Sequence, residues 1–535
     1  MIYYLLTYKD NDIYYSMGIP SYFSYIIKNH HKIIKEKHQD SIHELYFDSN
    51  SIIYDSIRKI LKKEKVQLQL QHKDLYYTIC LQLEHYIKQI NPTELVYISF
   101  DGIAPFAKLK QQRDRRFKSQ YTKQILQSIL QKKTTDEWDT CAITPGTTFM
   151  KDLDIYVNNH FKDFPIPVIF SGSRKCGEGE HKIMQHIRNT KNIEKTAVIY
   201  GLDADLIMLG LNHLSFRKNI FLYRETPEFI KNIRNSLEPN KTYLLDMQLL
   251  GQQTALELAG EDGDVNYIRK LYDYIFMCFM LGNDFMPHFP SVNIRTDGIY
   301  YLIEKYRGLF KNSDCLYDGE KIHWKNVRAL LQEIALEERD LLIQEHKKRV
   351  KAEKKHYPTN NDEEKEFKFL NIPTKHRQVE KYINPYEAYW EERYYKMLFD
   401  IQINDARRQE ICINYVEGLE WNMEYYTKGC IDWNWYYKYD YPPLFSDLIK
   451  HVPYNFKQLL ARKPEAPVSN FFQLSYVLPK NSLYLLPANI KKRLLETDWY
   501  VDDCEFKWSY CKYFWESHTV LPDIQPKALE RILVM

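Results

Sequence analysis

Seven acidic residues could share one chemical task, because they occur in five short segments that each adjoin an apolar run. A carboxylate at the end of a buried element is costly unless a positive partner gathers it. Hard divalent cations bind through oxygen ligands, so the pattern predicts a metal-dependent catalytic pocket. The seven residues are Asp48, Asp101, Glu178, Glu180, Asp203, Asp205 and Asp284.

The elements that must position these acids follow the pattern of parallel α/β folds. The run LYF delivers Asp48 at the end of a strand, after which Ser49 or Asn50 can cap a helix. LVYISF repeats this arrangement with Asp101, and GLDADLIMLG places two further acids at the exit of a third strand. Ligands of open α/β sheets bind at these strand ends, so we expect the acids to converge there.

The remaining acids lie next to backbone-bending residues. Glu178 and Glu180 occur in CGEGEHKIMQHIRN, where the glycines permit a tight turn before a helix. Asp284 follows an apolar run and precedes Pro287, which interrupts a helix. Each acid taken singly could be a helix cap or a turn residue. If all seven acids had only such local roles, their occurrence beside buried runs in five separate segments would be a coincidence. We therefore prefer a single site that all seven share.

The expected chemistry is phosphodiester cleavage. It needs an activated water and stabilisation of charge on the leaving oxygen, and two metal ions about 4 Å apart can supply both. Seven carboxylates suffice for two Mg²⁺ or Mn²⁺ ions, some as direct ligands and others through water. Without metal, mutual repulsion should raise several of the carboxyl pKa values.

A run of phosphate-binding residue types follows Asp101 directly. The string GIAPFAKLKQQRDRRFKSQY places donors at three- and four-residue spacing, so much of the set shares one helix face. Such a face offers charged and neutral donors to a phosphate. A solvated basic helix is the alternative, and the adjacency to Asp101 favours phosphate binding. The residues are Lys108, Gln112, Arg115 and Arg116.

Length and composition allow a large enzyme without locating its binding surface. The 535 residues carry a net charge of +3, so any nucleic-acid surface must be local. The nine cysteines include no Cys-x-x-Cys pair, which argues against structural zinc and indicates a reducing compartment. The longest strictly apolar run, residues 275–282, is too short to cross a bilayer. We expect an intracellular protein without membrane contact.

The chain divides by pattern at a charged stretch. Before it, strand-like runs alternate with helical patterns, which predicts an α/β fold with a twisted, mostly parallel central sheet flanked by helices. Residues 346–381 are charged and weakly periodic, and we interpret them as a connector. The aromatic-rich residues 382–535 predict a largely helical second region that packs on the α/β domain, residues 17–345.

Several strings resemble the XRN family of 5′→3′ exoribonucleases. From residue 17 to about 310 they are MGIPSYFSYI, LYFDSNSII, SFDGIAPFAKLKQQRDRRF, ITPGTTFM, VIFSGSRKCGEGEHKIM, YGLDADLIMLGL and FMLGNDFMPHFPS. A second block, from YWEERYYKMLF through VEGLEWNMEYYTKGCIDWNWYY to FFQLSYVLPKNSLYLLP, resembles the family's second conserved region. The resemblance therefore spans most of the chain.

The resemblance implies a nuclease core of the PIN and flap-endonuclease type with two Mg²⁺ or Mn²⁺ ions held by the seven acids. It also implies stepwise release of nucleoside 5′-monophosphates from single-stranded RNA that bears a 5′ monophosphate. The family's pocket for that phosphate is matched by Lys108, Gln112, Arg115 and Arg116. In the family this pocket is small, so a cap should be excluded. The implied setting is RNA decay, including mRNA decay, by a cytoplasmic monomer. A nuclear or virion location and the protein partners stay open.

The chain departs from the family where the leading base should stack. Family members often carry a histidine six residues after the first aspartate, and this chain has Tyr54. A tyrosine ring can stack but lacks the proton-dependent role of histidine. The partner ring is expected to be Trp433 or Trp435 in IDWNWYY, with ordinary core packing as the alternative for either.

Residues 1–16 precede the family-like start at Met17 and match no targeting class. We expect that translation begins at Met17 or that this extension is dispensable. We also expect a compact form of the family that lacks the long C-terminal extensions of larger relatives. One alternative function is a flap endonuclease-like DNA nuclease, a class that lacks the KLKQQRDRR helix and the second block. Another alternative is a catalytically silent RNA-binding scaffold. Such a protein would have lost one or more of the metal-site carboxylates, and all seven acidic residues are present in this chain.

Overall fold

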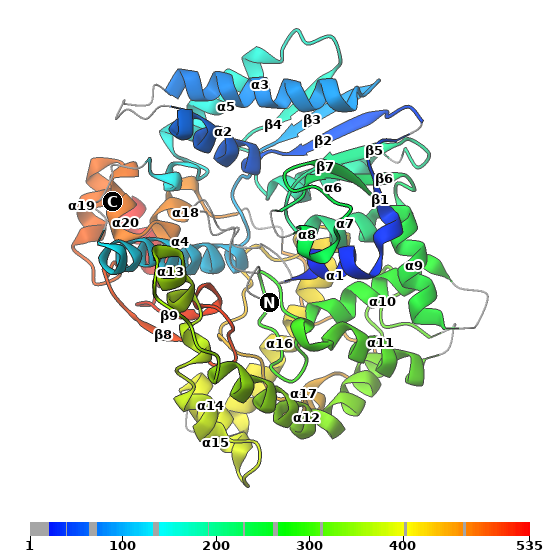
Figure 1. Ribbon diagram of the computed structural model, residues 1–535, viewed down its shortest axis with the longest axis vertical. Coiled ribbons are helices and arrows are strands. Elements are labelled where there is room, and N and C mark those ends of the chain that lie inside the picture. Colours follow the sequence, from blue (N-terminus) through cyan, green and yellow to red (C-terminus); the bar gives the residue numbers. More distant parts are fainter. Residues whose placement is uncertain are drawn as a thin grey trace.

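The computed structural model describes residues 21–38, 40–63, 72–131, 138–190, 192–227, 230–260, 266–310, 314–400, 404–463 and 467–534. The expected extension 1–16 and the family-like start at Met17 lie outside the described residues. Within these ranges, one seven-stranded sheet lies between helical layers, and a larger helical region adjoins it (Figure 1).

The sheet is mostly parallel. Its strands lie in the order β1-β7-β6-β5-β2-β3-β4. Neighbouring strands from β6 to β4 are parallel, whereas β7 is antiparallel to both β6 and β1. This confirms the predicted fold class. The strands are β1 (Ile34–Lys35), β2 (Glu44–Asp48), β3 (Leu95–Ser99), β4 (Val168–Ser171), β5 (Ala197–Tyr200), β6 (Ile220–Glu225) and β7 (Thr242–Asp246).

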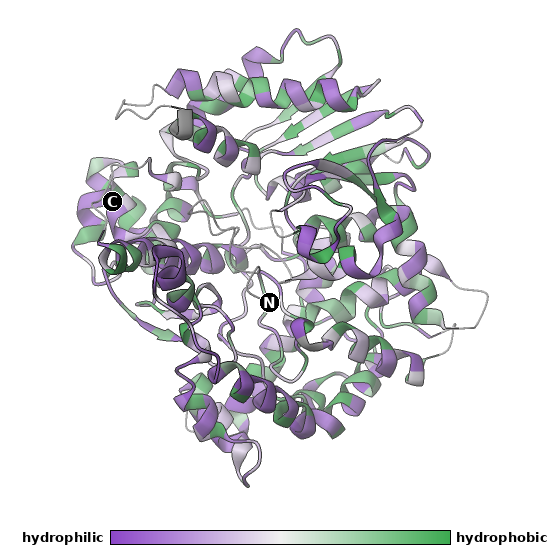
Figure 2. Ribbon diagram, in the orientation of Figure 1, coloured by the Kyte–Doolittle hydropathy of each residue, from purple (hydrophilic) through white to green (hydrophobic). Residues whose placement is uncertain are grey.

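Both faces of the central strands are covered, because successive side chains of a strand point to opposite faces. Leu45 and Phe47 of β2 pack beneath α2 (Asn50–Lys63), α3 (His72–Ile90) and α5 (Thr148–His160). Tyr46 points to the other side, into the core with α6, α7, α9 and α10. Figure 2 shows apolar residues along the strands. The helices of that second side are α6 (Gly179–Thr190), α7 (Asp205–Asn212), α9 (Met247–Ala259) and α10 (Tyr267–Phe279).

The chain reverses its direction of travel across the sheet at β2. The strands β2, β3 and β4 follow one another toward one edge, and the chain then crosses back to β5 on the other side of β2 and continues to β6. In open α/β sheets the carboxyl ends beside such a reversal form a crevice. The ends of β2 and β5 are therefore the expected place for a ligand.

Helix α4 (Phe106–Leu130) joins the sheet to the C-terminal helices (Figure 1). Its residues Phe106 and Leu109 share a core with the C-terminal residues Phe472, Ile490 and Leu529. Those residues belong to α18 (Asn470–Val477), α19 (Ala488–Leu495) and α20 (Pro526–Val534). An early helix thus depends on late parts of the chain for its packing.

The charged stretch 346–381 is bound into the molecule. Helix α12 (Trp324–Glu353) extends into it, and α13 (Asp362–Leu370) and α14 (Gln378–Ile383) follow. Glu380 is 2% exposed and accepts hydrogen bonds from Arg349, Arg377 and the backbone N–H of Tyr510. These contacts connect the stretch to the end of the chain, while the division into separate domains stays a prediction.

The rest of the second region is largely helical, as predicted. None of the helices in the described part of the chain has the length and apolar character needed to cross a membrane. Further elements are α1 (Tyr22–Asn29), α8 (Ile230–Ile233), α11 (Gly298–Leu309), α15 (Trp390–Phe399), α16 (Asp405–Thr427), α17 (Phe445–His451), β8 (Glu505–Lys507) and β9 (His518–Val520).

Candidate active site

Three adjacent strands deliver four of the acidic residues at their carboxyl ends. Asp48 is the last residue of β2, and Asp101 follows the end of β3 by two residues. Asp203 lies just after β5, and Asp205 is the first residue of α7. Because β5, β2 and β3 are neighbours in parallel register, the four carboxylates are brought to one edge of the sheet, as predicted.

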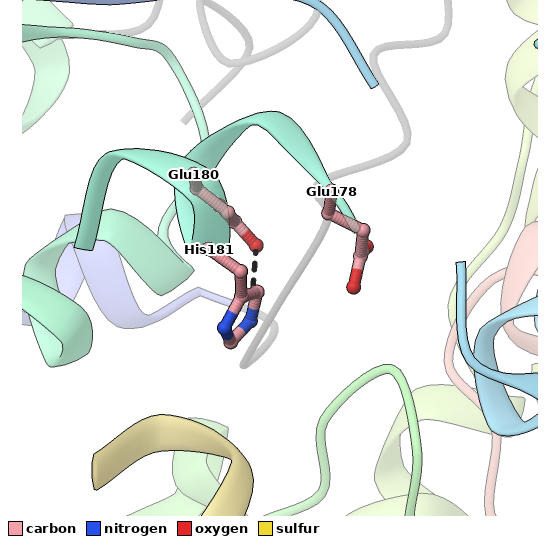
Figure 3. Close-up of side chains that lie close together, drawn as sticks. All are labelled: Glu178, Glu180 and His181. Carbon is pink, nitrogen blue, oxygen red and sulfur yellow. Dashed lines mark ion pairs between the residues drawn. The ribbon is translucent and has the colours of Figure 1, made fainter. Parts of the chain in front are cut away.

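A glycine turn brings Glu178 and Glu180 to the same edge. Gly177 has a φ of 99°, which favours glycine, and α6 begins two residues later at Gly179. The N–H of Gly179 donates to Oδ1 of Asp101 at 2.6 Å. A Cβ at Gly179 would lie 2.5 Å from a carboxylate oxygen of Asp48, so no larger residue fits without displacement. Figure 3 shows the two glutamates at the start of this helix.

Lys108 connects the last acidic residue to the others. Asp284 lies in the loop after α10, and its Oδ2 is 2.6 Å from Nζ of Lys108. The same ammonium nitrogen lies 2.7 Å from Oε1 of Glu178. All three side chains are buried. The cluster thus contains one cation of the protein's own, contributed by α4.

Burial and mutual repulsion favour protonation of the carboxyl groups. Burial raises the pKa of Asp48 well above its usual range, and the charges of Asp101 and Asp203 raise it further. Burial likewise raises the pKa of Glu180, with a second contribution from Glu178. Carboxyl groups with such raised pKa values hold protons in a metal-free pocket.

Three further groups at this site have perturbed pKa values. Burial raises the pKa of Asp203 to about 6, although Lys108 opposes the shift. Burial also raises the pKa of Asp205 well above its usual range, and Asp284 adds to this shift. For Lys108, burial disfavours the charge, but Asp284 and Glu178 together outweigh burial and raise the pKa well above its usual range. Lys108 therefore carries a full positive charge.

The site fits a divalent metal. Within two groups of side chains, potential ligand atoms all lie within 4.8 Å of one another, and Glu180 belongs to both groups. Oε2 of Glu180 and Oδ1 of Asp205 are buried without a hydrogen-bond partner in the described part of the chain. Leaving a buried carboxylate oxygen unpaired is unfavourable, and a cation relieves that cost. The groups are Glu178, Glu180 and His181, and Asp48, Glu180 and Asp203.

Sequence reasoning missed three residues of this site. Asn50, expected as a helix cap, instead donates from Nδ2 to Oδ2 of Asp101 at 2.6 Å and accepts from the Asp101 N–H. Tyr425 of α16 donates its hydroxyl to Oε2 of Glu178 at 2.8 Å, and its ring stacks on His181 with centroids 3.7 Å apart. The position of His181 directly after GEGE was a usable signal. Tyr425 had none among 44 tyrosines.

The proposed phosphate-binding residues all lie on α4. Lys108 contacts carboxylates, as described above. Nη1 of Arg116 donates to Oγ1 of Thr144 at 2.6 Å, and Oε1 of Gln112 is buried without a hydrogen-bond partner in the described ranges. The positive charge of Arg115 lowers the pKa of Asp203, so this guanidinium acts on the carboxylate cluster. The helix therefore places donors beside the acids.

Tyr54 lies next to these arginines. Burial raises the pKa of its hydroxyl, and the charges of Arg116 and Arg115 oppose this shift. The ring is partly buried against the core beneath α2. Tyr54 thus lies beside the part of α4 that carries Arg115 and Arg116.

The two candidate tryptophans differ in exposure. Trp435 is 7% exposed and stacks on Trp421 with centroids 5.2 Å apart, in the core of the helical region. Trp433 is partly exposed, and its carbonyl oxygen accepts from the N–H of Phe106 at 2.8 Å, two residues before Lys108. Of the two residues, Trp433 is therefore the more exposed, and its backbone lies beside the start of α4.

Two family models match the chain. The model described as XRN 5′-3′ exonuclease N-terminus matches residues 17–226. The model described as Xrn1 helical domain matches residues 264–382 and 373–534. Together they cover strands β1 to β6, all seven acidic residues and most of the helical region, and β7 lies between the two matched ranges.

Curated relatives match along nearly the whole chain. The 5′-3′ exoribonuclease 1 of Saccharomyces cerevisiae is 27% identical, over 96% of this chain and 43% of the relative. The 5′-3′ exoribonuclease 1 of Schizosaccharomyces pombe is 26% identical, over 96% and 48%. The 5′-3′ exoribonuclease 2 homolog of Drosophila melanogaster is 26% identical, over 97% and 71%. The chain thus spans less than half the length of the two yeast relatives.

One solved structure with a detectable likeness is the catalytic core of Rad2 in complex with a DNA substrate. It is 13% identical, covers 54% of this chain and 69% of its own, and has a TM-score of 0.29. At this score the match adds nothing to the description of the fold.

Proposed function

The chain belongs to the XRN 5′-3′ exonuclease family. We therefore propose that it is a metal-dependent exoribonuclease. Its substrate would be single-stranded RNA with a 5′ monophosphate, and its products would be nucleoside 5′-monophosphates. The observation that carries the proposal is the position of Lys108, which pairs with Glu178 and Asp284 from the helix that bears the arginines. A 5′ phosphate and the adjacent scissile bond can therefore be held by one helix and one cluster.

Two divalent cations, Mg²⁺ or Mn²⁺, would be held by the acidic cluster. Bound there, they would supply Lewis acidity for activating water and for neutralising the departing 3′ oxygen. Buried unpaired oxygens on Glu180 and Asp205 support this assignment. The proposed ligands, directly or through water, are Asp48, Asp101, Glu178, Glu180, Asp203, Asp205 and Asp284.

The surrounding residues hold the carboxylates in place. Asn50 and the N–H of Gly179 fix the two oxygens of Asp101, and the hydroxyl of Tyr425 fixes Glu178. Partners of this kind orient ligand oxygens before a cation binds, which lowers the reorganisation needed for catalysis. We therefore assign Asn50, Gly179 and Tyr425 positioning roles.

The face of α4 would hold the 5′ phosphate in register. Arg115 and Arg116 offer planar forks of donors that suit phosphate oxygens, and Gln112 adds a neutral amide. The Arg116 guanidinium donates to Oγ1 of Thr144 at 2.6 Å, which orients its remaining donors. From the family membership we further propose that a cap or a triphosphate is excluded.

Aromatic rings would grip the leading bases. Tyr54 beside the arginines and the partly exposed Trp433 are the two rings best placed for this. Base stacking is sequence-tolerant and contributes about 1–3 kcal/mol per base, and it favours single strands. We accordingly place the reaction in RNA decay, including the decay of mRNA.

The test is a cleavage assay with purified protein and Mg²⁺ on end-labelled RNAs that carry a 5′ phosphate, a 5′ hydroxyl or a cap, together with a DNA flap. Release of mononucleotides from the phosphorylated RNA alone supports the proposal. Incision of the flap would indicate a DNA nuclease, and binding without cleavage would indicate a silent scaffold. Either result would refute the proposal.

Two variants separate chemistry from phosphate recognition. The double variant Asp203→Ala, Asp205→Ala should abolish cleavage while RNA binding persists. The double variant Arg115→Met, Arg116→Met should erase the preference for a 5′ phosphate over a 5′ hydroxyl. Arg307→Met removes an exposed guanidinium on α11 and serves as the control that should change neither property. Retained preference in the arginine double variant would show that the phosphate is bound elsewhere.

A further inference from the structure

A cavity of about 260 Å³ lies along α4, next to the catalytic cluster. Its walls come from α4, from the loop 282–295, from residues 437–441 and from residues 509–518. Asp284 and Arg115 are among the lining residues, so the cavity adjoins the site described above. Its remaining lining residues belong to neither the strand ends nor the glycine turn.

The walls combine aromatic rings with unpaired neutral polar atoms. Tyr437, Tyr439 and Trp515 line the cavity. Oε1 of Gln111 and Nε2 of His288, also in the lining, are buried and have no hydrogen-bond partner within the described residues. Burial lowers the pKa of His288 to about 4, so its ring is neutral at physiological pH. Aromatic faces with neutral donors and acceptors suit a heteroaromatic base.

A partly exposed ion pair also lines the cavity. Nζ of Lys110 lies 3.6 Å from Oδ1 of Asp440, and the two side chains are 29% and 24% exposed. Two further lining cations are already engaged: Lys118 is buried and donates to the carbonyl oxygens of Trp515 and Ser517 at 2.9 and 2.6 Å, and Arg295 pairs with Glu516. Lys110 is thus a cation beside solvent that could pair with an incoming phosphate.

We propose that this cavity is a second nucleotide site, which receives the nucleoside 5′-monophosphate released by cleavage. The base contacts His288, Gln111 and the aromatic wall, and the phosphate faces Lys110. The volume lies near the lower end of ligand pockets, about 300 Å³, and so suits one nucleoside unit rather than an oligonucleotide.

The inference rests on the proposed function and deepens it. In each catalytic cycle the arginines of α4 must release the phosphate of the product mononucleotide and bind the 5′ phosphate of the shortened RNA. A site that begins at Asp284 and Arg115 lets the product leave the arginines on the side of α4 that faces the cavity. The RNA can then advance while the product still occupies the protein.

The test is equilibrium dialysis of labelled adenosine 5′-monophosphate against the full chain. The catalytic site is first saturated with 5′-phosphorylated RNA whose leading linkages are phosphorothioates. We expect the mononucleotide to bind to the RNA complex at one equivalent. In unmodified protein, part of the inhibition of cleavage by added mononucleotide should persist at saturating RNA, because binding at the arginines of α4 competes with RNA and binding in the cavity does not. Exclusion of the mononucleotide by the bound RNA would overturn the proposal.

Variants then locate the site. His288→Leu and Gln111→Leu each remove the unpaired polar atom of that side chain from the cavity and should weaken mononucleotide binding about tenfold, the effect of one hydrogen bond. RNA affinity should not change. Gln124→Leu makes the same substitution on an exposed position of α4 outside the cavity and should have no effect. Unchanged mononucleotide binding in both cavity variants would overturn the assignment, and thermal melts identify any variant that fails to fold.

Binding and cleavage are measured separately, so the two proposals fail in different ways. A protein that binds the mononucleotide in the cavity but cleaves no RNA would retain the second site and lose the proposed function. A protein that cleaves phosphorylated RNA but binds the mononucleotide only in competition with RNA would retain the function and lose the second site.

Discussion

Nζ of Lys108 lies 2.6 Å from Oδ2 of Asp284, although both side chains are almost fully buried. Lys108 therefore acts as a resident cation in the acidic cluster, and it also contacts Glu178. Its charge offsets part of the repulsion among the carboxylates before any metal binds. Lys108 belongs to the same helix as Arg115 and Arg116, so this pair connects the acidic cluster to the helix that bears both arginines.

Replacing Lys108 with methionine should destabilise the metal-free protein. Removing one partner of a buried ion pair costs about 3–5 kcal/mol, because the remaining charges are left uncompensated. Added Mg²⁺ or Mn²⁺ should recover more stability in Lys108→Met than in the unmodified protein, since the cation then supplies the missing charge. Thermal melts with chelator and with metal measure both effects. Lys123→Met, at an exposed position of α4, is the control. An equal loss under both conditions would contradict a shared role of lysine and metal.

Replacing Gly179 with alanine should strongly reduce cleavage. The new Cβ would lie 2.5 Å from a carboxylate oxygen of Asp48 and must displace it. A displacement of about 1 Å in a catalytic group costs roughly 10²-fold in rate. Single-turnover cleavage of phosphorylated RNA measures the loss.

Gly308 offers the matched control for this substitution. It lies in helix α11, where an added Cβ would meet nothing within 4 Å. Alanine in a helix interior is about 0.5–1 kcal/mol more favourable than glycine, so Gly308→Ala should keep its activity and gain slight stability. Normal cleavage by Gly179→Ala would show that the turn is not tightly constrained.

The stability of the metal-free protein should fall as the pH rises through the acid range. Asp203 has a pKa of about 6 in the folded protein, against an ordinary value of 3.8. Between these values the folded state holds a proton that the unfolded state has lost, so increasing pH favours unfolding. Asp48, Glu180 and Asp205 are shifted in the same direction and extend the effect.

Divalent metal should reverse this trend, because it binds the deprotonated carboxylates. The difference in melting temperature between Mg²⁺ and chelator should therefore widen toward neutral pH. The substitution Asp203→Asn should make this difference in melting temperature smaller. A difference that is independent of pH would mean that these carboxyl groups do not bind the ion.

The two tryptophans should separate binding from stability. Trp433→Ala should weaken the affinity for single-stranded RNA by about 1–3 kcal/mol, the contribution of one stacked base, with little change in unfolding. Trp435→Ala should instead reduce the free energy of unfolding by about 3–5 kcal/mol, because it leaves a cavity against Trp421. Fluorescence anisotropy with phosphorothioate RNA and urea unfolding measure the two quantities. The opposite result, in which Trp435→Ala weakens RNA binding and Trp433→Ala destabilises the protein, would indicate that Trp435 contacts the RNA.

Local sequence patterns were sufficient to predict the acidic residues at the strand ends and the helix α4. Asp48 and Asp101 directly follow apolar runs, and the spacing of Lys108, Gln112 and Arg115 depends only on helix geometry. Contacts between distant segments left no such signal. Tyr425 lies 247 residues from the glutamate that it contacts.

Local composition was also a poor guide to burial in two places. Trp433 and Trp435 are two residues apart in one string, and only the packing of Trp435 on Trp421 distinguishes them. The charged stretch 346–381 gave no sign that Glu380 would be buried between two arginines, because pairing depends on partners that a charge count does not reveal.

The contact between α4 and the end of the chain has a consequence for biosynthesis. Lys118 donates to carbonyl oxygens that come 397 and 399 residues later in the sequence. At about 5–20 residues per second, α4 leaves the ribosome roughly 20–80 s before those carbonyls are made. Its apolar residues Phe106 and Leu109 wait equally long for their partners. The nascent sheet can therefore form early, while α4 stays open to chaperones and proteases until the segment that contains residues 515–529 has been made.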